Sequence, residues 1–324
     1  MIVRIRRKFL NLLIYVLALT FSCAVYISLI PFAQDSVIGL NVSNQTVLAR
    51  VNVSNTEPSL YDVRITYPSI PIDLTANADT TIICNGSVYD TNGFDDIMNV
   101  TATFYYNETP SIASDDGNNH YSNISCGNCS VIPGSGNQNG SCLCQFAVRY
   151  YANPGLWQCN MTVNDSGGLT STFNSSFVRV NEVIGINVEN TTLDYGALSV
   201  SQTSNPIREN VTNTGNIPIN FTVRGYGGDD ESIGQNVSMI CEAGTNITFG
   251  YQRYSLLSST TYADMYNLTN QSRQVINITI PQRTSEGGFG NSSNSTFWRL
   301  QVPIGAAGIC NGTIIFGAID ALNR

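Results

Sequence analysis

The chain begins with an almost unbroken apolar run and continues as short stretches in which apolar and polar residues alternate. The run covers residues 9–32 and follows a basic head, residues 1–8. As a helix it would be about 35 Å long, enough to cross a hydrocarbon core of about 30 Å. Basic residues stay in the cytoplasm, so the pattern predicts a signal-anchor transmembrane helix with the C-terminal bulk outside the cell. A signal peptide cut near residue 33 is the alternative, and it would make the protein secreted.

Residues 59–183 alternate with a period of two between turns rich in Gly, Asn, Asp and Pro. This pattern is typical of strands with one buried face, and no window shows a sustained 3.6-residue period. About seven such strands predict a β-sandwich. A polar insertion, residues 107–144, interrupts the rhythm.

A second alternating unit, residues 184–324, predicts a second sandwich, in which residues 255–267 form the only plausible short helix. Residues 33–58 form a linker with one alternating segment, residues 46–54, that we expect to be a strand. Its own first domain could take up this strand, or the strand could complete a neighbour's sheet. The fold class is therefore all-β, with two tandem Ig-like β-sandwich domains after an N-terminal transmembrane helix.

Eight cysteines follow the apolar run, and an even number in an exported, loop-rich chain predicts disulfides. Cys84 and Cys159 sit centrally in strands that would face each other across the first sandwich, so we expect them to pair. Cys241 and Cys310 are the only two cysteines of the second unit, which favours a bridge between them.

The other four cysteines lie close together in or just after the insertion. Pairing Cys129 with Cys142 and Cys126 with Cys144 would suit a hairpin, although other pairings remain open. A zinc site of four thiolates is the alternative, but the C-x-C half matches a zinc ribbon poorly.

Asparagine is placed unusually often in the pattern Asn-x-Ser/Thr, about two dozen times against roughly seven expected by chance. Such residues could decorate the solvent face of strands, but Asn is depleted in strands and Thr alone would serve that face. The excess therefore predicts N-glycosylation. The candidate acceptors are Asn85, Asn99, Asn107, Asn123, Asn160, Asn174, Asn190, Asn210, Asn220, Asn236, Asn246, Asn267, Asn277, Asn294 and Asn311.

Charge and chemistry exclude several classes of protein. The net charge is −8, and the chain beyond its basic head is more negative still, which argues against nucleic acid as a partner. Lys8 is the only lysine, so the outer part cannot form a Schiff base or a P-loop. The only histidine, His120, lies in the polar insertion and is expected to be exposed. We therefore expect no catalytic residues and no enzymatic activity.

Carboxylates gather in two turns. Residues 229–231 and the pair at 95–96 could serve a glycosidase, but Asp commonly caps backbone N–H groups in turns. Asp90, Asn92 and Asp95 are spaced around a glycine like the start of a Ca²⁺ loop, although the terminal Glu of an EF-hand is absent. An ordinary Asp/Asn/Gly turn explains the same residues, and apart from this Ca²⁺ candidate no cofactor is expected.

Several of these stretches resemble a known kind of module. TTIICNGSVYDTNGFDDIMNVTATFYY and YYANPGLWQCNMTVNDSGG resemble Ig-like modules of predicted archaeal cell-surface glycoproteins. IRENVTNTGNIPINFTVRGYG, followed by FWRLQVPIGAAGICNGTIIFGAI, resembles a second Ig-like type from the same kind of protein. The resemblance covers most of residues 50–320 and implies extracytoplasmic β-sandwiches without catalytic residues.

The leading hypothesis is a membrane-tethered extracellular glycoprotein with a structural, adhesive or envelope-associated role. Its partners would be the membrane, through the N-terminal helix, and proteins or glycans at the cell surface. One alternative is a filament subunit that self-associates by β-strand addition. The other is a surface receptor for a ligand or glycan.

Overall fold

The computed structural model describes residues 46–127, 129–275, 278–286 and 290–322. The predicted basic head and transmembrane helix, residues 1–32, lie outside the described residues, as does the candidate acceptor Asn277. Within the described part of the chain, no helix has both the length and the apolar character needed to cross a membrane.

Residues 46–53 fall outside the compact unit that Ser54–Arg324 forms. The strand predicted for residues 46–54 is wrong, because this stretch pairs with no strand that the structure describes. Its side chains are exposed, with Val47 at 87% and Val51 at 82% of their full accessible surface. Alternation shows that the segment could cover a core, but a strand also needs a partner to accept its backbone hydrogen bonds.

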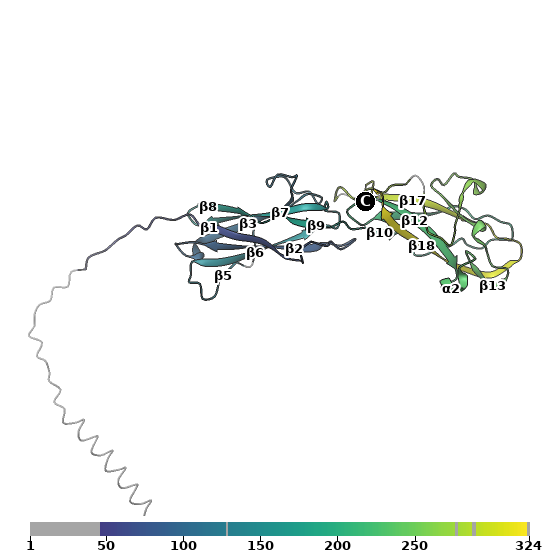
Figure 1. Cartoon of the computed structure of the whole chain (residues 1–324), viewed down its shortest axis with the longest axis horizontal. Coiled ribbons are helices and arrows are strands. Elements are labelled where there is room, and N and C mark those ends of the chain that lie inside the picture. Colours follow the sequence, from purple (N-terminus) through teal and green to yellow (C-terminus); the bar gives the residue numbers. More distant parts are fainter. Residues whose placement is uncertain (1–45, 128, 276–277, 287–289, 323–324) are drawn as a thin grey trace, which may run out of the picture. The chain divides into compact units, whose positions relative to one another are not determined.

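The first sandwich consists of two antiparallel sheets, visible as two layers in Figure 1. One sheet has the order β1 (Ser59–Tyr67), β2 (Thr80–Tyr89), β6 (Asn139–Val148) and β5 (Ser130–Val131). The other has the order β4 (His120–Asn123), β3 (Ile97–Tyr106), β7 (Gly155–Asp165) and β8 (Thr170–Asn174), and β9 (Val178–Val180) also pairs with β7.

Strand β7 shows how the alternation builds this core. Trp157, Cys159 and Met161 are fully buried, whereas the residues between them face outward and are partly exposed. The Trp157 ring stacks on Phe104 of β3, with ring centroids 4.8 Å apart. Period-two patterning therefore places one face of each sheet in a shared apolar core, as the sequence predicts.

The second sandwich is also built from two sheets. One has the order β10 (Ile186–Val188), β11 (Ile207–Asn213), β17 (Ser293–Leu300), β14 (Gln252–Ser255) and β15 (Tyr266–Asn267). The other links β13 (Ile240–Gly244), β18 (Ala306–Asp320), β12 (Ile219–Gly227) and β16 (Arg273–Gln274). Among the described strands, none of β1–β9 pairs with any of β10–β18. The segment between the two groups of strands, residues 181–185, contains the domain boundary predicted between residues 183 and 184.

A separate apolar core fills the second sandwich around Trp298. Its ring lies 5.1 Å from that of Tyr254, centroid to centroid. Buried Asn213 organises the turn after β11: its Nδ2 donates to Ile217 O at 2.8 Å and to Ile280 O at 3.1 Å. Its Oδ1 accepts from Gly215 N at 2.9 Å, so one amide bonds three backbone groups. Ile280 O also accepts from Ile219 N at 2.9 Å, so Ile217 O and Gly215 N depend most on this side chain.

The helix expected over residues 255–267 is wrong. Strand β14 reaches Ser255, and the stretch holds a single 3-10 turn, η3 (Tyr262–Asp264), before β15. A four-residue α-helix, α2 (Glu231–Gly234), forms instead where the sequence predicts a turn. Asp230 caps it by accepting from Ser232 N at 2.9 Å, since a side-chain oxygen can satisfy a free N–H at a helix start.

Candidate functional site

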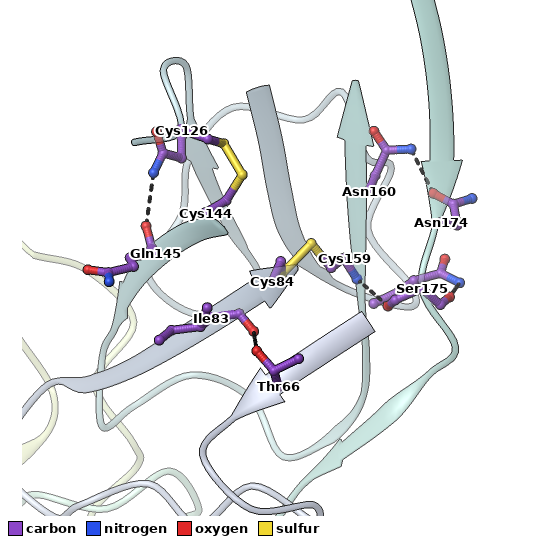
Figure 2. Close-up of a disulfide and its surroundings, with 12 residues drawn as sticks. Thr66, Ile83, Cys84, Cys126, Cys144, Gln145, Cys159, Asn160, Asn174 and Ser175 are labelled. Carbon is purple, nitrogen blue, oxygen red and sulfur yellow. Dashed lines mark hydrogen bonds between the residues drawn. A yellow bond between two sulfur atoms is a disulfide. The ribbon is translucent and has the colours of Figure 1, made fainter. Parts of the chain in front are cut away.

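Four disulfides cross-link the two sandwiches internally, and they join the same cysteines that the sequence pairs: Cys84–Cys159, Cys126–Cys144, Cys129–Cys142 and Cys241–Cys310. Figure 2 shows the first of them running between β2 and β7, with the second beside it on β6. Because all four cysteines of the insertion are oxidised, they offer no thiolate to zinc. Four disulfides indicate that the chain matures in an oxidising compartment.

The described candidate glycosylation sites are all at the surface. None of them is buried, and eight are exposed: Asn107, Asn174, Asn190, Asn236, Asn246, Asn267, Asn294 and Asn311. The asparagines that the described chain does bury are Asn118, Asn213 and Asn216, and none of these begins an Asn-x-Ser/Thr pattern. The described candidate acceptors and the buried asparagines are therefore separate sets, and glycosylation of the first set stays a prediction.

Two candidate acceptors lie directly opposite each other on the outer face of the first sandwich. Asn160 of β7 is the register partner of Asn174 of β8, and its Nδ2 donates to the Asn174 Oδ1 at 2.6 Å, as drawn in Figure 2. The next outward pair on the same strands is Thr162 with Thr172, whose hydroxyls are 2.9 Å apart. All four of these outward side chains are polar and uncharged.

The predicted Ca²⁺ ligands do not gather as a set. Asp90 is fully buried, but Asp95 is exposed, and Asn92 Oδ1 accepts from Thr56 N at 2.8 Å. The structure instead places Asp90 with Asp96 and Asp165, and one carboxylate oxygen of each lies within 4.8 Å of the others.

Sequence reasoning missed Asp165 because it lies 75 positions after Asp90. The signal that could have found it is strand register. Asp165 ends β7 and pairs with Ile97, the first residue of β3, so it must lie beside the turn that contains Asp96.

The other carboxylates and the histidine have structural partners. Asp230 caps α2, and its hydrogen bonds, first of all from the Ser232 hydroxyl, lower the pKa of its carboxyl. Glu231 forms an ion pair with Arg224. The expectation of an exposed His120 is wrong: it is 2% exposed, because β4 pairs with β3 and places the ring over Tyr105. Its Nδ1 lies 3.0 Å from Asp115 Oδ1, and its Nε2 lies 3.0 Å from Ser111 O.

A groove of about 1140 Å³ opens in the second sandwich. Apolar side chains line it from several segments, among them Leu193, Leu198, Ile247, Leu300 and Phe316. Two polar side chains also line it, buried Gln252 and partly buried Tyr195. Gln252 Nε2 donates to the Tyr195 hydroxyl at 3.0 Å, and desolvation of that hydroxyl raises its pKa.

Strand β18 borders this groove, and part of it is an open sheet edge. Its residues 306–311 pair with β13, and its residues 312–320 pair with β12. Among the described strands, residues 312–319 pair with β12 and with no other strand, so one backbone edge of this eight-residue stretch is open. An unpaired edge is a ready acceptor for another strand.

No protein-family model matches the sequence, and neither does any curated protein. Among solved structures, the chain is similar to one from a chaperone–tip adhesin complex of CFA/I fimbriae biogenesis, with 12% identity and a TM-score of 0.29 over 82% of this chain and 84% of that one. It is also similar to a carbohydrate-binding module of the β-sandwich superfamily, with 13% identity, a TM-score of 0.23 and coverage of 83% and 99%. A third is the C-terminal domain of the AgI/II polypeptide BspA of Streptococcus agalactiae, with 7% identity, a TM-score of 0.22 and coverage of 81% and 95%. TM-scores this low support no conclusion about function.

Proposed function

We propose that the chain is a membrane-tethered extracellular glycoprotein with a structural, adhesive or envelope-associated role and no enzymatic activity. The observation that carries this proposal is the combination of four disulfides with candidate glycan acceptors that lie at the surface wherever the structure describes them. Disulfides persist outside the reducing cytosol, and N-glycans need accessible asparagines. Its partners would be the membrane, through the N-terminal helix, and proteins or glycans at the cell surface.

The chemistry of the described residues supports a role without catalysis. His120 has an acceptor at each ring nitrogen, so neither is free to act as a general base. The carboxylates of the second sandwich that could act in pairs are used as a helix cap and an ion pair. Asp230 and Glu231 do not line the groove, whereas Asp194 and Glu209 do. Asp194 Oδ1 accepts from Gly196 N, and Glu209 Oε1 accepts from Asn190 N, each at 2.9 Å.

Protease treatment of intact cells tests the tether and its orientation. Arg50 lies in the exposed segment, residues 46–53, so trypsin should cut there and release a soluble fragment that begins at Val51. The Arg50→Gln variant, which lacks this site, should stay on the cell under the same treatment. Full protection of the wild-type chain on intact cells would contradict the proposed orientation, and a mature chain found only in the medium would contradict the tether.

A second candidate function is a filament subunit, and the unpaired segment and the open edge of β18 favour it together. Residues 46–53 present Val47, Ala49, Val51 and Val53 along one side when extended, and the described chain gives them no partner. The open edge, residues 312–319, is of similar length and lies beside an apolar groove. Strand addition would bury this apolar side in the groove of a second copy and satisfy the free backbone groups of both.

Two matched variants distinguish a filament subunit from a tethered monomer. Val51 and Leu48 are exposed to 82% and 84%, but in an extended strand they point to opposite sides. Val51→Asp should abolish assembly of the purified chain, as measured by light scattering and electron microscopy, because it would place a charge in the groove. Leu48→Asp should assemble nearly normally. Equal assembly of both variants, or a wild-type chain that stays monomeric, would rule the filament out and leave the tethered monomer.

A further inference from the structure

We propose that Asp90, Asp96 and Asp165 form a Ca²⁺ site at one end of the first sandwich, where the linker joins it. The three residues come from three segments: Asp90 directly follows β2, Asp96 lies in the 3-10 turn η1 (Phe94–Asp96), and Asp165 ends β7. A carboxylate oxygen of each lies within 4.8 Å of the others, so three negative groups converge on one point.

Two of the three residues are buried, and Asp96 is partly exposed. Asp90 is fully buried and Asp165 is 3% exposed. Among the described residues, no arginine or histidine forms an ion pair with any of the three aspartates. Buried carboxylates this close repel one another strongly unless a proton or a cation is shared between them.

Two carboxylate oxygens lack any donor. Asp90 Oδ2 and Asp96 Oδ2 are both buried, and neither accepts a hydrogen bond from the described chain. The opposite oxygens are held in place: Asp90 Oδ1 accepts from Asn92 N at 2.7 Å, and Asp96 Oδ1 accepts from the Ser166 hydroxyl. Asp90 and Asp96 are thus each fixed through one oxygen while the other is left available, which is the arrangement that a metal ligand needs. Both oxygens of Asp165 accept a hydrogen bond, Oδ1 from Leu169 N and Oδ2 from Asn55 Nδ2, each at 2.8 Å, so Asp165 would use a remaining lone pair to contact a cation.

The turn that carries Asp96 is anchored by packing. Phe94, at the start of η1, is buried in the first core and covers Gly140 of β6. A Cβ at Gly140 would lie 1.9 Å from the Phe94 ring, so only glycine leaves room for this contact. The site is therefore built by the fold and does not depend on a loose loop.

Oxygen ligands without nitrogen or sulfur select a hard divalent cation. Ca²⁺ accepts irregular arrangements of about six to eight oxygens, whereas Mg²⁺ demands a near-regular octahedron of about six and keeps several waters. Three carboxylates brought in from separate segments match Ca²⁺ better, with water completing the coordination.

The same residues hold the first residues of the compact unit. Asp165 Oδ2 accepts from Asn55 Nδ2 at 2.8 Å, and Asn92, two residues after Asp90, accepts from Thr56 N. A bound cation would therefore fix not only the turn but also the point at which the linker attaches, in a domain that we place outside the cell.

Calorimetric titration of Ca²⁺ into the EDTA-stripped full chain tests the site. The wild type and the Asp95→Asn control should bind Ca²⁺, and Ca²⁺ should raise the melting temperature of their first sandwich. The Asp90→Asn/Asp96→Asn double variant should lose that binding at least tenfold. Asp95 is a fair control because it neighbours the site but is exposed and outside the cluster.

The melting temperature of the double variant without metal shows whether this variant folds. Without metal it should melt no lower than the stripped wild type, because two amides remove the repulsion among the carboxylates. Equal Ca²⁺ binding by the double variant, or no Ca²⁺-dependent shift in the wild type, would overturn the proposal. Equal affinity for Mg²⁺ would overturn the assignment to Ca²⁺.

Discussion

Cys84 and Cys144 lie directly opposite each other on the paired strands β2 and β6, yet they do not bond to each other. Cys84 reaches across the sandwich to Cys159, and Cys144 bonds to Cys126. Both side chains are fully buried in the same core. One of these bridges therefore ties the two sheets together, while the other ties the insertion to the sheet beside it (Figure 2).

Removing the bridge between the sheets should destabilise the first sandwich. We expect Cys84→Ala/Cys159→Ala to lower its free energy of unfolding by about 2–5 kcal/mol, because the bridge spans 75 residues and its loss also leaves a cavity. Both cysteines must change together, since a lone Cys84 thiol would lie opposite Cys144 and could exchange with its disulfide. Denaturant unfolding followed by tryptophan fluorescence would measure the change.

The chain supplies a reporter for each sandwich. It has two tryptophans, and Trp157 and Trp298 are fully buried in different cores. In a Trp298→Phe background the remaining signal reports the first sandwich, and in a Trp157→Phe background it reports the second. Loss of the Cys84–Cys159 bridge should shift the first signal and leave the second nearly unchanged, and equal shifts of both would contradict two independent cores.

The buried side-chain amide of Asn213 should contribute strongly to the stability of the second sandwich. Asn213→Ala removes three hydrogen bonds and leaves Ile217 O, Ile280 O and Gly215 N buried without this partner. We expect the second sandwich to lose about 2–4 kcal/mol in free energy of unfolding. Asn187→Ala, at an exposed position on β10, should change it by less than about 0.5 kcal/mol. A cost for Asn213→Ala that is no larger than the cost for Asn187→Ala would contradict the assigned role.

Alkaline pH should destabilise the protein through two partly buried tyrosines, Tyr121 and Tyr195. Burial raises the pKa of Tyr121 and Tyr195 above the ordinary value of 10.0. The folded state therefore keeps these protons longer than the unfolded state does, so stability is full below about pH 10 and is lost as the pH rises above it. The melting temperature should accordingly fall between pH 9 and pH 11.

Phenylalanine variants isolate this effect. Tyr195→Phe should flatten the dependence of melting temperature on pH, because Phe has no proton to lose, whereas Tyr67→Phe at an exposed position should not. The slope is the readout, since Tyr195→Phe also removes the hydrogen bond from Gln252 at every pH. Identical slopes for the two variants would contradict the assignment.

The sequence predicts most of this fold, and the reasons for its failures are specific. Alternation locates the long strands because each has one buried face, and the cysteine positions on those strands predict the cross-sheet bridge. Alternation of apolar and polar residues does not show whether a segment has a partner strand. For this reason the sequence predicts a strand at residues 46–54, although the structure leaves this segment unpaired. Residues 255–267 lack strong alternation, yet tertiary contacts draw both of their ends into a sheet.

The candidate cation site was only half predictable. Asp90 could be found because it lies in an Asp/Asn/Gly turn, but its partners depend on which side chains point inward. Asp95 and Asp96 are adjacent, and the choice of Asp96 depends on tertiary contacts: Phe94 packs in the core, and Ser166 donates to the Asp96 carboxylate. His120 illustrates the same limit, since pairing of β4 with β3 buries a residue that its polar neighbours suggest is exposed.

Peptide mapping of the native protein without reduction is the most direct test of the central claim, that this is an extracellular disulfide-bonded glycoprotein. It should recover four bridged peptide pairs, Cys84 with Cys159 among them, and glycan masses on surface asparagines such as Asn174 or Asn311. It should find Asn213 and Asn216 unmodified, because they are buried and lack the acceptor pattern. Free thiols at Cys84 and Cys159 together with unmodified surface asparagines would contradict it.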